Sequence, residues 1–121
     1  MTPRVDRGEL DSNVNGLFFL GEMLFSGESV ETLKDGTLAT LTTYVDGVEE
    51  GPHRMWHDNG ALEFSCELHD GNPVGLAQAW SEDGRLEEEQ FFDGHGALAW
   101  SRRWSADGDL VEDTSAAART A

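Results

Sequence analysis

The feature that most constrains the fold of this chain is a repeat of 24 residues. Glycines recur at that spacing, leucines follow two positions later, and tryptophans stand four positions before three of the glycines: Gly36, Gly60, Gly84 and Gly108; Leu38, Leu62, Leu86 and Leu110; Trp56, Trp80 and Trp104. A fixed period of this size is typical of an array of one small unit that packs against its own copies. The repeat therefore predicts an elongated array and not a domain around one central core.

Each repeat contains the signals of a β-hairpin. Its turn reads Trp-x-x-Asp/Asn-Gly-x-Leu at residues 56–62, 80–86 and 104–110, and a weaker copy at residues 32–38 begins with Thr32. Asp-Gly and Asn-Gly between apolar residues are typical of tight turns, because glycine adopts the positive φ that such turns need. A three-residue loop would then place each tryptophan across from its leucine, as a cross-strand pair.

A second turn divides each repeat into two strands. Asp-Gly pairs lie at residues 46–47 and 70–71, a third pair at 93–94 comes one residue early, and Ala99 stands where the next glycine is expected. Between the turns, apolar and polar residues alternate, as at residues 62–68, which is typical of strands. We therefore predict an all-β fold: a single-layer antiparallel β-meander of repeated hairpins with a period of 24 residues.

The ends of the chain are expected to differ from this domain of residues 11–113. Residues 11–27 contain an apolar stretch that is too short to cross a bilayer, and they are interpreted as a degenerate first repeat that caps the array. Residues 1–10 are expected to form an N-terminal extension. Residues 114–121 are small and polar, which predicts a flexible C-terminal tail.

These turns resemble the variant MORN repeat, named after the membrane occupation and recognition nexus. The resemblance covers residues 28–112, and the sequence departs from the pattern at Thr32, around Gly94 and at Ala99. It implies a meander of antiparallel hairpins in one elongated sheet. Bacterial proteins built from this variant are often grouped as antitoxin-like or immunity-like, so the resemblance also implies a protein partner.

The charge of the chain restricts the class of partner. There are 24 acidic and 8 basic residues, which give a net charge of −16. This charge argues against binding to nucleic acid or to an anionic membrane. It either keeps a thin sheet with open edges soluble, or complements a basic protein such as a nuclease toxin. Alternation along the strands predicts four glutamates on the face opposite Leu62, Phe64, Leu86 and Phe92, and they are candidate partner-binding residues: Glu63, Glu67, Glu87 and Glu89.

Two single residues complete the predictions. Trp100 falls outside the repeat frame, so it either packs at the end of the array or anchors a partner, and we include it among the candidate partner-binding residues. Cys66 is the only cysteine, which excludes an internal disulfide, and its place on the apolar face of a strand predicts a buried thiol. Without a disulfide or a recognisable secretory leader, the sequence favours the cytoplasm.

The sequence contains no recognisable catalytic constellation. His53 and His57 lie four residues apart without a third ligand at metal-site spacing. Residues 58–59 and 70–72 could at most bind calcium weakly, and no phosphate loop or nucleophile elbow is present. We therefore expect no catalytic residue, no cofactor and no metal. The sequence predicts a non-enzymatic acidic protein-binding module, most specifically an immunity protein or antitoxin that neutralises a basic toxin. The alternatives are a self-assembling scaffold and an inhibitor that imitates nucleic acid. The sequence leaves the identity of the partner and the oligomeric state open.

Overall fold

The computed structural model describes residues 2–115, and the elements of this part of the chain are strands apart from one short 3-10 helix. Their bounds are β1 Arg4–Asp6, η1 Arg7–Glu9, β2 Asp11–Ser12, β3 Phe18–Leu20, β4 Met23–Leu24, β5 Gly27–Thr32, β6 Leu38–Val45, β7 Val48–Trp56, β8 Leu62–His69, β9 Asn72–Trp80, β10 Leu86–Phe92, β11 Leu98–Trp104 and β12 Leu110–Asp113. No helix in residues 2–115 is long and apolar enough to span a bilayer.

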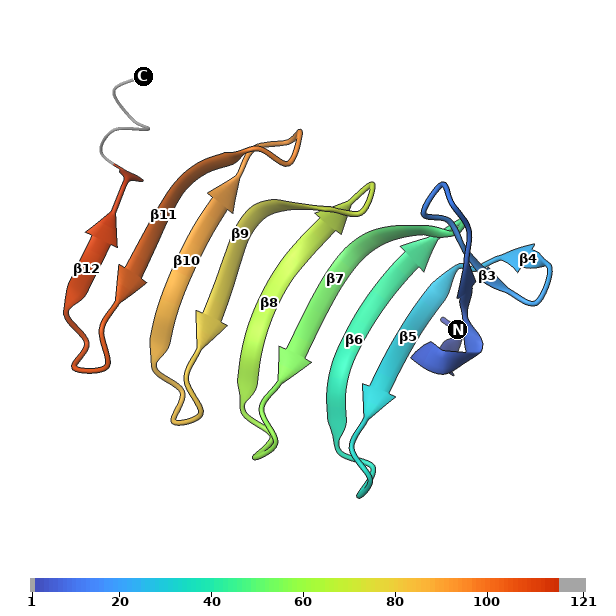
Figure 1. Ribbon diagram of the computed structural model, residues 1–121, viewed down its shortest axis with the longest axis horizontal. Coiled ribbons are helices and arrows are strands. Elements are labelled where there is room, and N and C mark those ends of the chain that lie inside the picture. The colour runs from blue at the N-terminus through green and yellow to red at the C-terminus, as the bar shows by residue number, and fades with distance from the viewer. Residues whose placement is uncertain (1, 116–121) are drawn as a thin grey trace.

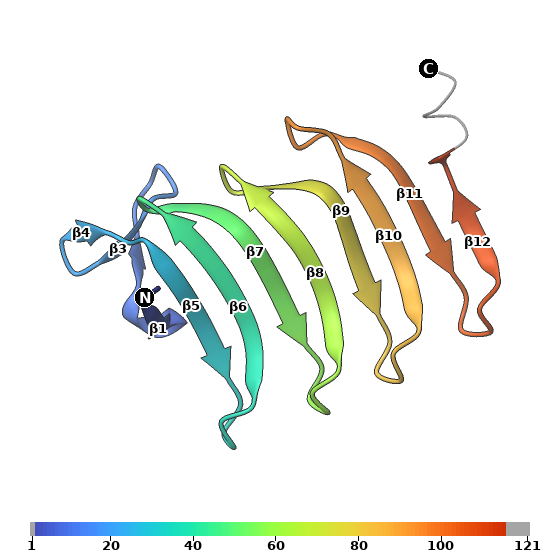
Figure 2. The same ribbon diagram turned by 180° about the vertical axis from the view of Figure 1, so that it is seen from behind.

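Nine strands form one sheet in the order β1-β5-β6-β7-β8-β9-β10-β11-β12, and every neighbouring pair from β5 onward is antiparallel. Figure 1 shows this sheet as a single curved layer, with the N-terminal elements gathered at its β5 end. In the view from behind, residues 2–115 place no second layer over β6 to β12 (Figure 2). The prediction of an all-β antiparallel meander is therefore confirmed for residues 27–113.

The turns at the lower edge of the sheet in Figure 1 join β5 to β6, β7 to β8, β9 to β10 and β11 to β12. These lower turns share one pattern of hydrogen bonds. In the second of them the amide of His57 donates to the carbonyl of Ala61 at 2.8 Å, and the amide of Gly60 donates to the carbonyl of His57 at 2.9 Å. The glycines of the four turns have φ between 86° and 88°. The predicted cross-strand pairs are present, for example Trp56 opposite Leu62. Three residues, 58–60, lie between the bonded pair His57 and Ala61, so the predicted three-residue loop with a left-handed glycine is confirmed. A bulge lies beside each Trp–Leu pair.

The upper turns, at the opposite edge of the sheet in Figure 1, join β6 to β7, β8 to β9 and β10 to β11. The first two of them match their prediction. Asp46 and Gly47 both have positive φ, at 49° and 82°, and Asp70 and Gly71 have φ of 51° and 79°. Positive φ at both central residues defines a two-residue type I′ turn, whose twist matches that of the flanking strands. The Asp-Gly pairs at 46–47 and 70–71 therefore reverse the chain as expected.

The third upper turn differs, which explains why its sequence departs from the pattern. Residues 93–97 form a turn with the hydrogen bonds of the lower turns: the amide of Asp93 donates to the carbonyl of Ala97 at 2.9 Å, and the amide of Gly96 donates to the carbonyl of Asp93 at 3.0 Å. Gly96, with φ of 84°, takes the left-handed position. The carboxylate of Asp93 accepts hydrogen bonds from the amides of His95 and Ala97, at 2.9 and 3.0 Å. The shifted Asp93-Gly94 pair therefore reflects a change of turn type, and Gly94 does not have the positive φ that requires glycine.

The N-terminal residues are more closely tied to the sheet than the sequence indicated. β1 adds to the main sheet as a parallel neighbour of β5, with Arg4 opposite Glu28. The expected extension of residues 1–10 thus contributes a strand, and a parallel one. β2, β3 and β4 form a separate three-stranded sheet. The amide of Phe18 donates to the carbonyl of Gly47, and the amide of Gly47 donates to the carbonyl of Phe25, both at 2.8 Å, so this segment is fastened to the first upper turn.

Two buried clusters stabilise the sheet. The first, at the N-terminal end, contains Leu10, Phe25 and Tyr44, with Val5 and Phe18 packed against it. The second lies on one face of β8 to β10 and contains Cys66, Leu68 and Ala77, with Phe64 and Phe92 packed against it. A single-layer sheet has no second layer to cover its faces, so its apolar contacts gather in local clusters of this kind and not in one central core.

Cys66 is buried as predicted. Only 3% of its surface is exposed, and burial raises the pKa of its thiol to about 11. A thiol in this environment packs as a small apolar group, and its thiolate is scarce at neutral pH.

We therefore expect Cys66 to resist thiol reagents in the folded protein. Labelling with an aromatic disulfide reagent at pH 8 should proceed slowly in native protein and rapidly in urea, because access requires opening of the second cluster. Labelling at the rate of a free peptide thiol under native conditions would contradict this packing.

The start of the predicted C-terminal tail is bonded to β11. The amide of Thr114 donates to the carbonyl of Ser101 at 2.9 Å, and Arg102 donates to the hydroxyl of Ser115 at 3.1 Å. The rest of the predicted tail, residues 116–121, lies outside the described residues.

Candidate functional site

A group of exposed apolar side chains lies on the sheet face opposite the second cluster. In the pairing register Leu76 stands opposite Phe91, and Phe91 opposite Trp100, so the three form a row across β9, β10 and β11. Phe92 packs against the second cluster, and neighbouring residues of a strand point to opposite faces, so Phe91 and its row occupy the other face. Leu76 is 42% exposed and Phe91 is 38% exposed.

A polar row lies beside the apolar one on the same face. Gln78, Glu89 and Arg102 are opposite one another, two residues along each strand from Leu76, Phe91 and Trp100. Two residues is the repeat of side-chain direction in a strand, so both rows share one surface. We call this surface the β9–β11 face, formed by Leu76, Gln78, Glu89, Phe91, Trp100 and Arg102.

The aromatic side chains of the β9–β11 face are held in a fixed geometry. The rings of Phe91 and Trp100 are stacked, with centroids 5.8 Å apart and planes inclined by 8°. The guanidinium of Arg102 lies 4.6 Å from the centroid of the Trp100 ring. This arrangement is a cation–π contact, which is attractive because the ring face is electronegative. Trp100 is therefore supported from two sides while it remains partly exposed.

The polar row positions Arg102. The side-chain amide of Gln78 donates to Glu89 at 2.8 Å, and Arg102 lies 3.7 Å from the carboxylate of Glu89 and 3.4 Å from that of Asp113. These groups are partly buried, with 15% of the Glu89 side chain and 26% of the Arg102 side chain exposed. The charge of Arg102 is thus offset by two carboxylates, and its planar group is fixed over Trp100.

The four predicted glutamates do not form one uniform surface. A bulge between Leu86 and Glu88 interrupts the strand alternation that placed Glu87 beside Glu89. Glu87 lines a hollow together with Glu88 and Arg103, whereas Glu89 belongs to the polar row described above.

The other two glutamates of the set lie on β8. Glu67 is exposed, and Glu63 lies 3.6 Å from His57. Of the five candidate residues, the structure therefore brings together Glu89 and Trp100. Leu76, Phe91 and Arg102 complete their surface and were not in the predicted set.

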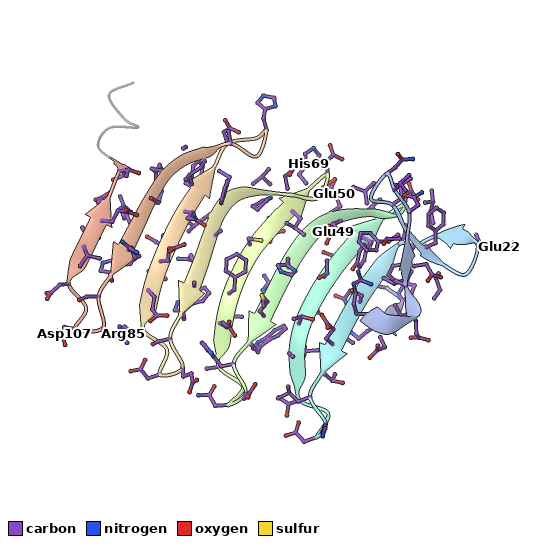
Figure 3. The ribbon with its side chains drawn as sticks, in the orientation of Figure 1. Glu22, Glu49, Glu50, His69, Arg85 and Asp107 are labelled. Carbon is purple, nitrogen blue, oxygen red and sulfur yellow. The ribbon has the colours of Figure 1, made fainter. Side chains whose placement is uncertain are left out.

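A second group of polar side chains lies at the upper ends of β7 and β8, where Figure 3 shows Glu50 and His69 side by side. Nδ1 of His69 is 2.9 Å from the carboxylate of Glu50, and Nε2 is 3.6 Å from that of Asp70. The hydrogen bond with Glu50 raises the pKa of His69. Sequence reasoning missed this group because Glu50 and His69 are 19 residues apart. The group could have been predicted from the hairpin register, because Gly51 is opposite Leu68 and the next residues outward are Glu50 and His69.

The two histidines that the sequence analysis considered have other roles. Nδ1 of His53 is 3.0 Å from the hydroxyl of Thr42, and burial lowers the pKa of His53. Nε2 of His57 is 2.7 Å from the carbonyl of Trp80, which links one lower turn to the next hairpin. Both histidines therefore have hydrogen-bond partners within the sheet.

Comparison with known proteins gives distant structural likeness and no family. No family model and no curated protein matches the chain. Among solved structures, the crystal structure of a mutant of S. aureus TarM in complex with fondaparinux, alpha-GlcNAc-glycerol and UDP is similar at a TM-score of 0.41 and 13% identity. The match covers 84% of this chain and 18% of that chain. A likeness at this level carries no functional argument.

Proposed function

We propose that this chain is a non-enzymatic protein-binding module that engages its partner through the β9–β11 face. The observation that carries the proposal is the row of Leu76, Phe91 and Trp100, in which two exposed apolar side chains lie beside a partly exposed tryptophan on an open sheet face. Tryptophan and arginine are enriched among the residues that dominate binding energy. Trp100 is already held by Phe91 and Arg102, so little side-chain entropy is lost when a partner covers it.

The proposed partner is a basic protein. A net charge of −16 accelerates encounter with a positively charged surface and disfavours acidic ones. The most specific form of the proposal is a cytoplasmic immunity protein or antitoxin that covers a basic toxin, such as a nuclease. The charge and the resemblance of the Trp-x-x-Asp-Gly-x-Leu turns to the variant MORN repeat support this form.

The proposal is tested by truncation of Trp100. The candidate partner for the test is the product of the gene that neighbours the gene of this chain. We expect Trp100→Ala to weaken binding to it by about 2 kcal/mol or more, which is roughly 30-fold in Kd. The control is Leu98→Ala. Leu98 is 52% exposed and opposite Phe92, which packs against the second cluster, so it lies on the other face. Surface plasmon resonance measures both variants. Equal affinities for Trp100→Ala and the wild type would refute binding through this face.

The charge of the partner is tested separately by reversal of exposed carboxylates. Glu67→Lys with Glu87→Lys should slow association, whereas Asp11→Lys with Glu22→Lys, the same change in net charge on β2 and the β3–β4 turn, should slow it less. Glu89 is left intact because a lysine there would face Arg102. Raising the salt concentration to 0.15 M, where exposed charges more than about 8 Å apart are screened, should also slow wild-type association.

The same variants test the simpler explanation that the charge serves solubility. In that case the doubly substituted protein would scatter more light and would associate with the partner as fast as the wild type. An association rate that is insensitive to both salt and charge reversal would remove the basic partner from the proposal.

A second candidate function, self-assembly as a scaffold, is favoured by β12. It is the last strand of the nine-stranded sheet in residues 2–115, and its Leu110 and Val111 are 51% and 57% exposed. An edge strand of this kind offers backbone groups for pairing with another chain. Light scattering after size exclusion should then show dimers that Val111→Lys dissociates. A wild-type monomer at all concentrations tested would exclude this candidate.

A further inference from the structure

The group formed by Glu50, His69 and Asp70 has the donor set of a metal site. One ligand atom from each of the three residues can be chosen so that all lie within 4.8 Å of one another. In a tetrahedral zinc site, bonds of about 2.0–2.1 Å place ligand atoms roughly 3.3 Å apart. The three side chains are 31%, 56% and 72% exposed, so their rotation can close the remaining distance without a change in the backbone.

The backbone around this group is held in place. Asp70 and Gly71 form a type I′ turn, and the amide of Gly71 donates to the carbonyl of Glu49 at 3.0 Å. This bond fixes the turn against β7, the strand that carries Glu50. The carboxylates of Glu50 and Asp70 are therefore kept near the imidazole of His69, with one oxygen of each within 4.8 Å of the same ring nitrogen.

A polar hollow adjoins the group. It has a volume of about 190 Å³ and is lined by His69, Asp70, Asn72, Gly94 and His95. The turn of residues 93–97 approaches closely, since a Cβ atom on Gly96 would lie 3.0 Å from Cβ of Asn72. The hollow leaves room for the water molecules that complete the coordination of an exposed ion, and it brings a second imidazole, that of His95, to its wall.

The first upper turn provides an internal comparison. It has the same type I′ geometry, with Asp46 and Gly47 in place of Asp70 and Gly71. Val45 stands where the second turn has His69, so the imidazole is absent although the aspartate is kept. The geometry of the turn alone therefore does not create the group, and the histidine distinguishes one copy from the other.

From these observations we infer that Glu50, His69 and Asp70 bind a divalent transition-metal ion of the Zn²⁺ type at the upper edge of the sheet. Imidazole is a ligand that suits zinc, copper and nickel, whereas sites built only from carboxylates and carbonyls suit magnesium and calcium. The two carboxylates offset the charge of the ion, and the acidic chain raises the local concentration of cations.

Calorimetric titration with ZnCl2 in the presence of excess MgCl2 tests the inference. Magnesium occupies the diffuse carboxylate sites of the surface and does not compete for imidazole. We expect saturable binding of one Zn²⁺ per chain. His69→Ala and Glu50→Gln should each lower the affinity by about tenfold or more, because each removes a ligand. Asp46→Asn, at the matched position of the first upper turn, should bind Zn²⁺ like the wild type.

Circular dichroism melting accompanies the titration, and all three variants are expected to fold because none of the substituted side chains is buried. A chemical-shift change of the His69 imidazole on addition of Zn²⁺ would support the site independently of the variants. The inference is overturned if binding in magnesium is not saturable, if His69→Ala retains wild-type affinity, or if Asp46→Asn weakens binding as much as His69→Ala does.

Discussion

Replacement of Tyr44 by alanine is expected to lower the free energy of unfolding by about 3–5 kcal/mol, the usual cost of truncating a large buried aromatic residue. Tyr44 is 3% exposed, and its ring lies 5.1 Å from that of Phe18 and 5.5 Å from that of Phe25. Its hydroxyl is 2.8 Å from that of Ser29, which is 2% exposed. The truncation therefore leaves a cavity in the first cluster and a buried hydroxyl without a partner.

Urea unfolding followed by tryptophan fluorescence measures this loss. Tyr44→Phe serves as the matched variant, because it removes the hydrogen bond and keeps the ring, so a loss of only about 1–3 kcal/mol is expected. Val45→Ala, at an exposed position next in the sequence, should change stability little. If Tyr44→Ala were as stable as Val45→Ala, the N-terminal elements would not be packed on the sheet as described.

The second large effect is expected at the glycines of the lower turns. Gly60 and Gly84 have φ of 88° and 86°, and a Cβ atom at either would meet no atom within 4 Å. Substitution by valine is therefore penalised by backbone conformation alone, by about 1–3 kcal/mol for each. The two turns are distinct sites, so the losses should add to about 2–6 kcal/mol in the double variant.

Gly94 provides the control for this prediction. It also has no atom within 4 Å of an added Cβ, but its φ lies outside the left-handed region. Gly94→Val should consequently be close to the wild type in thermal melting, whereas Gly96→Val, with φ of 84°, should be destabilised. Melting temperatures of Gly60→Val and Gly84→Val that equal that of Gly94→Val would show that the lower turns do not need glycine.

Local signals in the sequence were sufficient to predict the meander. The Asp-Gly and Asn-Gly turns act over a few residues, so the positions of the lower turns and the Trp–Leu pairs could be predicted from spacing. The parallel pairing of β1 with β5 could not, because it joins segments 24 residues apart without a turn signal between them. The turn at residues 93–97 was predicted at the wrong glycine, because Asp93-Gly94 imitates the two-residue pattern while Gly96 has the left-handed φ.

The candidate site was predicted only in part. Trp100 stood out because it breaks the repeat frame. Leu76 and Phe91 did not stand out, because apolar residues in strands are expected to face the core. Only the packing of Phe92 against the second cluster shows that Phe91 points to the opposite face. The bulge at Glu87 changed the predicted set of glutamates, because one extra residue interrupts the alternation of strand faces. Bulges depend on cross-strand register, which a single sequence specifies weakly.

The central claim, that a partner covers the β9–β11 face, is tested most directly by oxidative footprinting of the complex. Hydroxyl radicals modify exposed aromatic and aliphatic side chains, and mass spectrometry reports the rate at each residue. With the product of the neighbouring gene bound, oxidation of Trp100, Phe91 and Leu76 should slow strongly, while that of Val45 and Leu98 should stay as in the free chain. Unchanged oxidation of Trp100 and Phe91 in a saturated complex would contradict the account, because the partner would then bind elsewhere.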